Sequence, residues 1–185
     1  SSRPWSSVWM DLNADEETLL ARLDGKWRNQ LRAAEKKGMQ IESSDSDEAF
    51  DWMLERHSEL MQQRDFSGPP PDLVRRLRDE CDNIGHRFHT FRAMMESEPV
   101  AGITVVRHGT SATYLLGWNG PMGRKANANN LLLWSAVRLL KSEGCRWFDL
   151  GGIDPWNMPG ITEFKRGTRG REYRLVGEYL GWKGK

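Results

Sequence analysis

The 185-residue sequence lacks a strong charge of one sign and a long apolar run. Its formal net charge is only +1, so the overall charge argues neither for nor against a nucleic-acid partner. No apolar segment approaches the roughly 18 residues that a membrane span needs. The first residues, SSRPWSSVWM, do not have the pattern of a signal peptide. These absences predict a soluble, cytoplasmic protein without a membrane span.

Cysteine and histidine are also scarce. The two cysteines, Cys81 and Cys145, lie far apart in dissimilar settings, so two reduced thiols are expected, although one disulfide remains open. No cysteine or histidine pair has the spacing of zinc ligands, and we expect no metal site. The sequence also lacks a Ser-His-Asp or Cys-His constellation, so a covalent acyl-enzyme intermediate is not supported.

The composition is that of a folded globular chain, with 38% apolar and 29% charged residues. Its length fits a single domain over residues 1–185 that can bury a core without disulfides. Within it we expect an N-terminal lead-in with a basic helix over residues 1–38. The main core follows over residues 39–185.

The periodicity of apolar residues predicts a mixed α/β fold, in which helices flank one mostly antiparallel sheet. Helices are expected after Asp15 and over residues 26–37, 47–63, 72–81 and 129–144, with a short one from Gly160. Strands are expected over residues 8–12, 39–43, 89–96, 100–108, 111–118, 145–150 and 172–180. The short turns between residues 89 and 118 predict an antiparallel meander. Residues 119–128 are expected to form a loop.

Three stretches resemble the Fem-type aminoacyltransferases, a peptidoglycan interpeptide-bridge family. They are KWRNQLRAAEKKGMQIE near the start, DLGGID after the strand at 145–150, and GITEFKRGTRG after that. The run YLLGWN, a loop, NNLLLWSAVRLLKSEGC and RWFDL resembles the core of the GNAT N-acyltransferase fold. GITEFKRG is the most specific of these elements.

The resemblance implies an enzyme that transfers an amino acid from aminoacyl-tRNA to an amine, without metal or CoA. In the family the amine is usually on a peptidoglycan precursor, and two GNAT-like units share the work. This sequence matches one unit, the second. Either it is a fragment of a longer protein whose N-terminal GNAT-like unit is not in this sequence, or it is a single-unit relative that acts on a smaller peptide or amine. Two alternatives stay open: an acyl-CoA-dependent N-acyltransferase, and a non-catalytic substrate-binding unit.

Lys165, in EFKRG, is the first catalytic candidate. The resembling family has a lysine at this position, assigned to the acyl carbonyl and the terminal nucleotide. Acyl transfer from an ester develops an oxyanion, which a fixed cation stabilises more in the transition state than in the ground state. A surface lysine without a special role is the alternative. The adjacent Phe164 could stack on a base or fill the core.

Two acids are further catalytic candidates. Asp149 ends the strand at 145–150, near the sheet edge where ligands bind in open α/β folds, and Asp154 lies in the following loop. Either could orient the attacking amine or accept its proton. Equally, Asp149 could cap Gly151–Gly152 and Asp154 could cap the turn at Pro155.

The segment GRKANANNLLL occupies the place where CoA-dependent relatives bind pyrophosphate on backbone N–H groups. Arg124 remains, but Asn127, Asn129 and Asn130 replace the glycines that a close backbone approach needs. Asparagine caps helices well, so an anion could still bind there. This departure favours tRNA over CoA as the donor, and a plain capped helix is the alternative.

Aromatic and basic residues suit the single-stranded end of a tRNA. Among nine tryptophans, Trp27, Trp134 and Trp147 have core periodicity, whereas Trp118 and Trp156 do not. Trp118, Asn119 and Trp156 are therefore candidates to contact substrate, with packing onto the sheet as the alternative. Candidate phosphate contacts, which a solvated surface would also explain, form two clusters. These are Arg28, Arg32 and Lys36 on one helix, and Arg166, Arg169 and Arg171 close to Lys165, with Arg124 of GRKANANNLLL as a further candidate.

Overall fold

The computed structural model describes residues 4–64, 68–83, 85 and 87–177. Their strands form one sheet in the order β2-β3-β4-β5-β6-β1-β7. The strands are β1 (Ser6–Asp11), β2 (Gln40–Ser44), β3 (Arg87–Met95), β4 (Glu98–His108), β5 (Ser111–Asn119), β6 (Trp147–Gly152) and β7 (Arg171–Arg174). Every neighbouring pair is antiparallel except β5 and β6. The predicted mixed, mostly antiparallel sheet and its meander over β3, β4 and β5 are confirmed.

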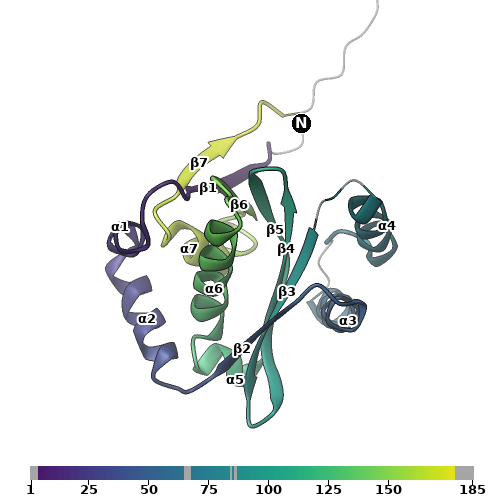
Figure 1. The fold of residues 1–185 in the computed structure, drawn as a ribbon, viewed down its shortest axis with the longest axis horizontal. Helices are drawn as coiled ribbons and strands as arrows, with labels where there is room; N and C mark the ends of the chain where they lie inside the picture. The colour runs from purple at the N-terminus through teal and green to yellow at the C-terminus, as the bar shows by residue number, and fades with distance from the viewer. Residues whose placement is uncertain (1–3, 65–67, 84, 86, 178–185) are drawn as a thin grey trace, which may run out of the picture.

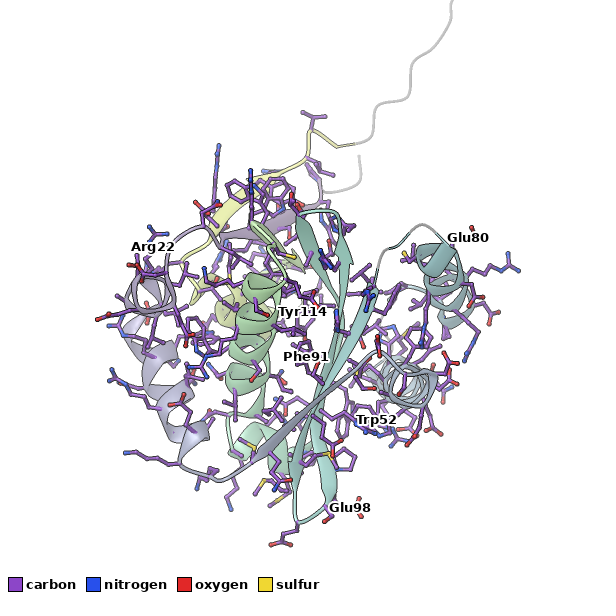
Figure 2. All side chains as sticks on the ribbon, in the orientation of Figure 1. Arg22, Trp52, Glu80, Phe91, Glu98 and Tyr114 are labelled. Carbon is purple, nitrogen blue, oxygen red and sulfur yellow. The ribbon has the colours of Figure 1, made fainter. Side chains whose placement is uncertain are left out.

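Helices cover both faces of this sheet (Figure 1). They are α1 (Glu16–Arg22), α2 (Gly25–Glu35), α3 (Asp47–Arg64), α4 (Pro71–Asn83), α5 (Pro121–Lys125), α6 (Ala128–Ser142) and α7 (Pro159–Arg166). The larger hydrophobic cluster packs α2 and α6 onto the sheet, with Trp134 and Phe148 fully buried. A smaller cluster around Phe50 and Phe88 lies under α3 and α4 on the opposite face. In Figure 2, Phe91 lies on the α6 side and Trp52 on the α3 side.

Aspartate side chains cap the N-terminal ends of α1 and α2. Asp15 accepts a hydrogen bond from the backbone N–H of Thr18, and Asp24 accepts one from the backbone N–H of Lys26. These side chains satisfy backbone donors that a helix start leaves free. The Asp24 cap fixes where α2 begins and so which residues face the core. The indole of Trp27 lies on the face of α2 that packs toward α6 and α7.

β5 and β6 form a fork. Their parallel pairing covers only Ser111–Thr113 and Trp147–Asp149, and beyond these residues the two strands are not paired. β5 also contains a bulge at Leu115, because Thr104 pairs with Leu116 while Val105 pairs with Tyr114. A bulge interrupts the alternation of side chains. Tyr114 and Gly117 consequently lie on the same face, and Leu116 packs into the cluster under α3.

The structure corrects three expectations. The loop over residues 119–128 contains the helix α5, which starts at Pro121, a favoured first helical residue. The last strand covers only Arg171–Arg174, and residues 178–180 lie outside the described part of the chain. Trp147 is 40% exposed rather than in the core. Within the segment expected as a lead-in, β1 lies in the sheet between β6 and β7.

Gly123 offers a test of how tightly α5 packs on the sheet. A Cβ at Gly123 would lie 2.4 Å from the carbonyl oxygen of Val100 and 2.4 Å from Oδ1 of Asn119. Because the backbone must shift to admit a methyl group, Gly123→Ala should lower the free energy of unfolding by about 1–3 kcal/mol. Gly25→Ala is the matched control, since nothing lies within 4 Å of its added Cβ. Urea denaturation of both variants measures the difference, and equal stabilities would contradict the packing described here.

Candidate active site

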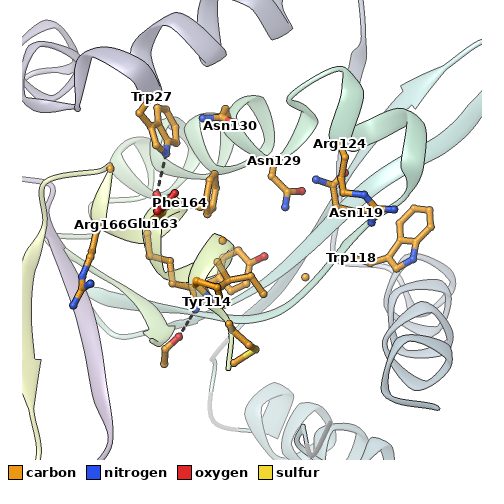
Figure 3. A pocket seen from close by; sticks show the side chains of 18 of the residues that line it. Trp27, Tyr114, Trp118, Asn119, Arg124, Asn129, Asn130, Glu163, Phe164 and Arg166 are labelled. Atoms are coloured by element: carbon orange, nitrogen blue, oxygen red, sulfur yellow. Dashed lines mark hydrogen bonds between the residues drawn. The ribbon is translucent and has the colours of Figure 1, made fainter. Parts of the chain in front are cut away.

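An open cavity of about 920 Å³ lies where β5 and β6 diverge. Its walls come from β5, the start of α2, the N-terminal end of α6, and α7, with His57 of α3 and Pro69 closing one side. In Figure 3, Trp27 and Phe164 lie at one end, Tyr114 lies in the middle, and Asn119, Arg124 and Trp118 lie toward the other end. The cavity therefore joins segments from most of the chain.

Lys165 is the buried cation of this cavity. Its side chain projects from α7, the residue is only 7% exposed, and Nζ donates a 2.7 Å hydrogen bond to the carbonyl oxygen of Gly152. Nζ also lies 5.4 Å from the centroid of the Tyr114 ring. Burial lowers the pKa of Lys165 to about 8, although the negative charge of Asp149 opposes the shift. The lysine is therefore cationic at neutral pH and retains N–H groups for a ligand.

The glycine pair that follows β6 makes room for this lysine. Gly151 has φ of +73°, a left-handed conformation that side chains rarely adopt. A Cβ there would lie 2.9 Å from the carbonyl oxygen of Tyr114 and 3.6 Å from Nζ of Lys165. The DLGGID motif therefore turns the chain away from β5 and directs the Gly152 carbonyl at the lysine.

Trp27 and Phe164 form an aromatic wall beside Lys165. Their ring centroids lie 5.9 Å apart in a stacked arrangement, and Nε1 of Trp27 donates to the carbonyl oxygen of Phe164 (Figure 3). Phe164 lines the cavity and also packs against the larger hydrophobic cluster. It thus combines the two roles considered from sequence, and Trp27 fixes the helix that holds Lys165.

Asp149 is a structural junction rather than a lining residue of the cavity. Its carboxylate accepts hydrogen bonds from the hydroxyl of Ser7, Nε1 of Trp9, the backbone N–H of Gly151 and the hydroxyl of Tyr173. Burial raises the pKa of Asp149, but these hydrogen bonds outweigh burial, and the net pKa lies below its usual value. A saturated carboxylate that ties β6 to β1 and β7 is poorly placed to accept a proton from an amine.

Asp154 holds its own loop together. It accepts hydrogen bonds from the backbone N–H groups of Trp156 and Asn157 and from Nδ2 of Asn157. This is the turn cap that the sequence left open as an alternative. Neither Asp154 nor the 70% exposed Trp156 lines the cavity. The predicted chemical role of Asp154 therefore has no geometric support.

The N-terminal end of α6 carries an amide-rich wall. Asn127, Asn129 and Asn130 all line the cavity, together with Asn119 at the end of β5. Asn127 has φ of +55° and forms no side-chain cap, which corrects the expected capping role. The Oδ1 atoms of Asn119 and Asn129 are buried without a hydrogen-bond partner among the described residues.

Acyl-CoA is the donor that a GNAT fold implies, and this end of the cavity fits its pyrophosphate poorly. A pyrophosphate needs N–H donors and cations. Here Arg124 donates Nη1 to the carbonyl oxygen of Asn119, and two unpartnered amide oxygens lie beside it. Both oxygens are enclosed by the protein, so they offer a pyrophosphate no donor.

The predicted arginines fall into two groups. Arg124, Arg166 and Arg169 line the cavity, although Arg166 pairs with both oxygens of Glu172 and Arg169 pairs with Asp24. Arg171 lies outside the lining, on β7. The stripe of Arg28, Arg32 and Lys36 also lies outside it, and Arg28 donates to the carbonyl oxygens of Ala21 and Leu23. α2 reaches the cavity through other residues, namely Lys26, Trp27 and Gln30.

Sequence reasoning missed two residues that shape the cavity. Tyr114 lines it from β5, and Gly117 lies beneath the phenol. A glycine inside a strand signals a close approach, which could have drawn attention to Gly117. Trp118 lines the cavity as predicted but also packs edge-on against Trp52, with centroids 5.7 Å apart.

Neither a metal-ligand cluster nor a membrane span is found in the described part of the chain. No group of three or more histidine, cysteine or acidic side chains is arranged there to hold a metal ion. No helix within these residues combines the length and apolar character needed to cross a membrane. Both cysteines are buried.

The Asp149 junction predicts a pH-dependent contribution to stability. Asp149→Asn replaces an acceptor of four hydrogen bonds by an amide, and should lower the free energy of unfolding at pH 7 by about 2–3 kcal/mol. Because its folded pKa is depressed, the contribution is present above the unfolded pKa of about 3.9 and is lost as pH falls through the folded pKa.

Urea denaturation from pH 7 to pH 3 should therefore show the difference between wild type and Asp149→Asn narrowing below about pH 4. The exposed Asp51, paired only with Arg75, gives the control Asp51→Asn, which should shift the free energy by less than about 0.5 kcal/mol. Equal effects of the two substitutions would contradict the junction.

Two solved structures of other proteins have a fold similar to that of this chain. The chain resembles the crystal structure of FemX, with a TM-score of 0.74, 12% identity, and coverage of 93% of this chain and 60% of that one. It also resembles the structure of L-PGS from Bacillus licheniformis, with a TM-score of 0.59, 13% identity, and coverage of 94% and 59%. The chain thus spans about 60% of the length of these two structures.

A third similar structure is an aminoglycoside acetyltransferase from an uncultured soil metagenomic sample in complex with sisomicin. Its TM-score is 0.54 at 16% identity, with coverage of 78% of this chain and 97% of that one. No curated protein sequence matches the chain. The profile of the acetyltransferase (GNAT) domain matches residues 22–166. This match extends from α1 to Arg166 of α7 and includes Lys165, and the chain belongs to the GNAT acetyltransferase-domain family.

Proposed function

We propose that this GNAT-type acyltransferase domain forms an amide bond by transferring an amino acid from aminoacyl-tRNA to an amine. The observation that carries the proposal is the buried, cationic Lys165, held by the Gly152 carbonyl and directed into an open cavity. The motif EFKRG around it is the most specific part of the resemblance to Fem-type enzymes. A surface lysine would be screened by water, whereas a buried one acts in a low-dielectric site.

The reaction follows from this geometry. The amine nitrogen attacks the ester carbonyl, a C–N bond forms, and the carbonyl electron pair moves onto oxygen. Lys165 stabilises that oxyanion through an N–H group that Gly152 does not use. Collapse of the intermediate breaks the bond to the ribose oxygen, which leaves as the 3′-hydroxyl after receiving the proton released by the amine. No enzyme nucleophile takes part.

The two ends of the cavity support a tRNA terminus as the donor. The wall of asparagine side chains at the N-terminal end of α6 supplies amide groups that can pair with the hydroxyl and amino groups of a terminal adenosine. Lys26, Arg124, Arg166 and Arg169 stand along the lining, where cations can meet backbone phosphates. The predicted stripe of Arg28, Arg32 and Lys36 adds nothing to the cavity itself.

The proposed acceptor is an amine on a peptidoglycan precursor, on a short peptide or on another small molecule. Because the chain spans about 60% of the FemX structure, a further GNAT-like unit could complete the acceptor cleft. The likeness to an aminoglycoside acetyltransferase keeps acyl-CoA as the alternative donor. In a third reading, this chain binds substrate while a partner unit performs the chemistry.

A donor assay separates these readings. The protein is incubated with a charged tRNA pool or with acetyl-CoA, each with a mixture of free amino acids and short peptides, and loss of ester or thioester is followed. We expect amine-dependent deacylation of tRNA that weakens as salt rises, because phosphate contacts release counterions. Robust thioester turnover with inert tRNA would instead support the CoA reading. Turnover of neither donor would support the non-catalytic reading.

Lys165→Met separates chemical loss from unfolding. The variant should lose about 10²–10³-fold in kcat, the usual cost of one oxyanion donor. It should nevertheless gain about 1 kcal/mol of stability at pH 7, because a buried ammonium is replaced by an apolar side chain of similar length. A destabilised Lys165→Met, or one with wild-type kcat, would contradict this role.

The lowered pKa of Lys165 also predicts two pH effects. Activity should fall as pH rises through about 8, where the lysine loses its proton, and the need for a neutral amine should limit activity at low pH. Stability should change with pH in the opposite direction to activity, because the unfolded chain binds the Lys165 proton more tightly than the folded chain does. The wild-type free energy of unfolding should therefore rise between about pH 8 and the unfolded value of about 10.4, and Lys165→Met should lack this rise.

A further inference from the structure

We propose that the Tyr114 hydroxyl is a catalytic group, a second donor to the carbonyl oxygen that Lys165 stabilises. This rests on the proposed acyl transfer and applies to either donor. Tyr114 lines the cavity from β5, and its ring lies 5.4 Å from Nζ of Lys165. Tyr114 projects from β5 and Lys165 from α7, where Nζ is held by the Gly152 carbonyl at the end of β6, so a carbonyl group between them would meet both.

The backbone of β5 is shaped around the phenol. The bulge at Leu115 brings residue 117 onto the same face as Tyr114. A Cβ at position 117 would lie 1.9 Å from the Tyr114 hydroxyl oxygen and 2.8 Å from Cζ. Only glycine leaves room for the head of this side chain, so the bulge and Gly117 together position the hydroxyl.

The hydroxyl forms no hydrogen bond to a described residue, and it belongs to a side chain that lines the cavity. The other phenol of the described sheet, that of Tyr173, donates to Asp149. Tyr114 therefore retains its donor for something that enters the cavity. A phenylalanine would serve packing alone and would crowd a Cβ at position 117 less, because the closest contact, at 1.9 Å, is to the hydroxyl oxygen.

The protonation states of the two groups complement each other. Burial raises the pKa of Tyr114 far above its usual value, so the phenol keeps its proton throughout the working range. Lys165, with a pKa of about 8, becomes partly neutral in mildly alkaline solution. A neutral donor beside a titrating cation keeps one hydrogen bond on the oxyanion after the lysine has lost its charge.

No proton leaves the phenol in this step. As the amine attacks, the carbonyl electron pair moves to oxygen, and the Tyr114 O–H and a Lys165 N–H each donate a hydrogen bond to that oxygen. When the intermediate collapses, the C=O bond is restored and both hydrogen bonds weaken. The proton of the attacking amine ends on the leaving oxygen, so atoms and electrons balance with Tyr114 unchanged.

Tyr114→Phe removes only the hydroxyl and tests the proposal with whichever donor the wild type consumes. We expect kcat to fall about 100-fold with KM changed less than about threefold, as for loss of one oxyanion donor. If both groups act on one oxygen, the double variant with Lys165→Met should lose much less than the product of the two single losses. A Tyr114→Phe variant that keeps a third or more of wild-type kcat overturns the proposal.

Gly117→Ala supplies an independent test that leaves the phenol chemically intact. Its methyl group must displace the Tyr114 hydroxyl, so kcat should fall in the wild-type background. In the Tyr114→Phe background the same substitution should cost much less, because the oxygen at 1.9 Å is gone and only the ring atoms still crowd the methyl group. Equal losses in the two backgrounds would mean that Gly117 acts independently of the hydroxyl, which overturns the proposal.

Gly102→Ala is the matched control, since its added Cβ would meet Trp52 at 2.6 Å on the α3 side of the neighbouring strand. It should reduce thermal stability without a specific loss of kcat in the folded protein. A Gly102→Ala loss as large as that of Gly117→Ala would overturn the proposal, because general strain would then explain both. If the wild type transfers from neither donor, the function and the role of Tyr114 fail together. If it transfers and Tyr114→Phe is unaffected, only the role of Tyr114 fails.

Discussion

The separation of β5 from β6 is the constraint on which the site depends, and the Asp149 carboxylate maintains it. Three hydrogen bonds, from Ser7 and Trp9 of β1 and from Tyr173 of β7, hold β6 to its antiparallel side, and a fourth comes from Gly151 within β6. On the other side, β6 pairs with β5 over three residues only. The cavity opens where that short pairing ends. Because a partly satisfied buried carboxylate would be costly, complete saturation makes the junction stable.

The second constraint is the placement of a positive charge inside this fork. Lys165 gives up hydration, as its lowered pKa indicates, and receives one carbonyl contact and a distant carboxylate in return. A chain selected for stability alone would place an apolar residue there. The surrounding structure supports the charge through Gly151, which turns the chain, and through Trp27, which fixes α7 by its contact with Phe164. The charge then faces the cavity rather than bulk water.

Periodicity in the sequence predicted the sheet, the meander and most helices, because alternation and helical spacing are local properties of the chain. Lys165 and the asparagine wall were also predicted, the first by its motif and the second by its place before a helix. Residues whose role depends on distant partners were not. From the sequence, Asp149 and Arg28 looked available for ligands. In the structure, Asp149 accepts hydrogen bonds from Ser7, Trp9 and Tyr173. Arg28 donates to the backbone carbonyl oxygens of Ala21 and Leu23. The bulge at Leu115 depends on register with β4, so the position of Tyr114 could not be read from β5 alone.

The structure of a complex with a non-hydrolysable 3′-aminoacylamino-adenosine tests the central claim most directly. The account predicts the aminoacyl carbonyl oxygen within about 2.7–3.1 Å of Nζ of Lys165, between the arms of the fork. It also predicts the adenosine toward the wall formed by Asn119 and Asn129. An analogue bound along the Arg28–Lys36 stripe, or one in the cavity with its carbonyl group turned away from Lys165, would contradict the account.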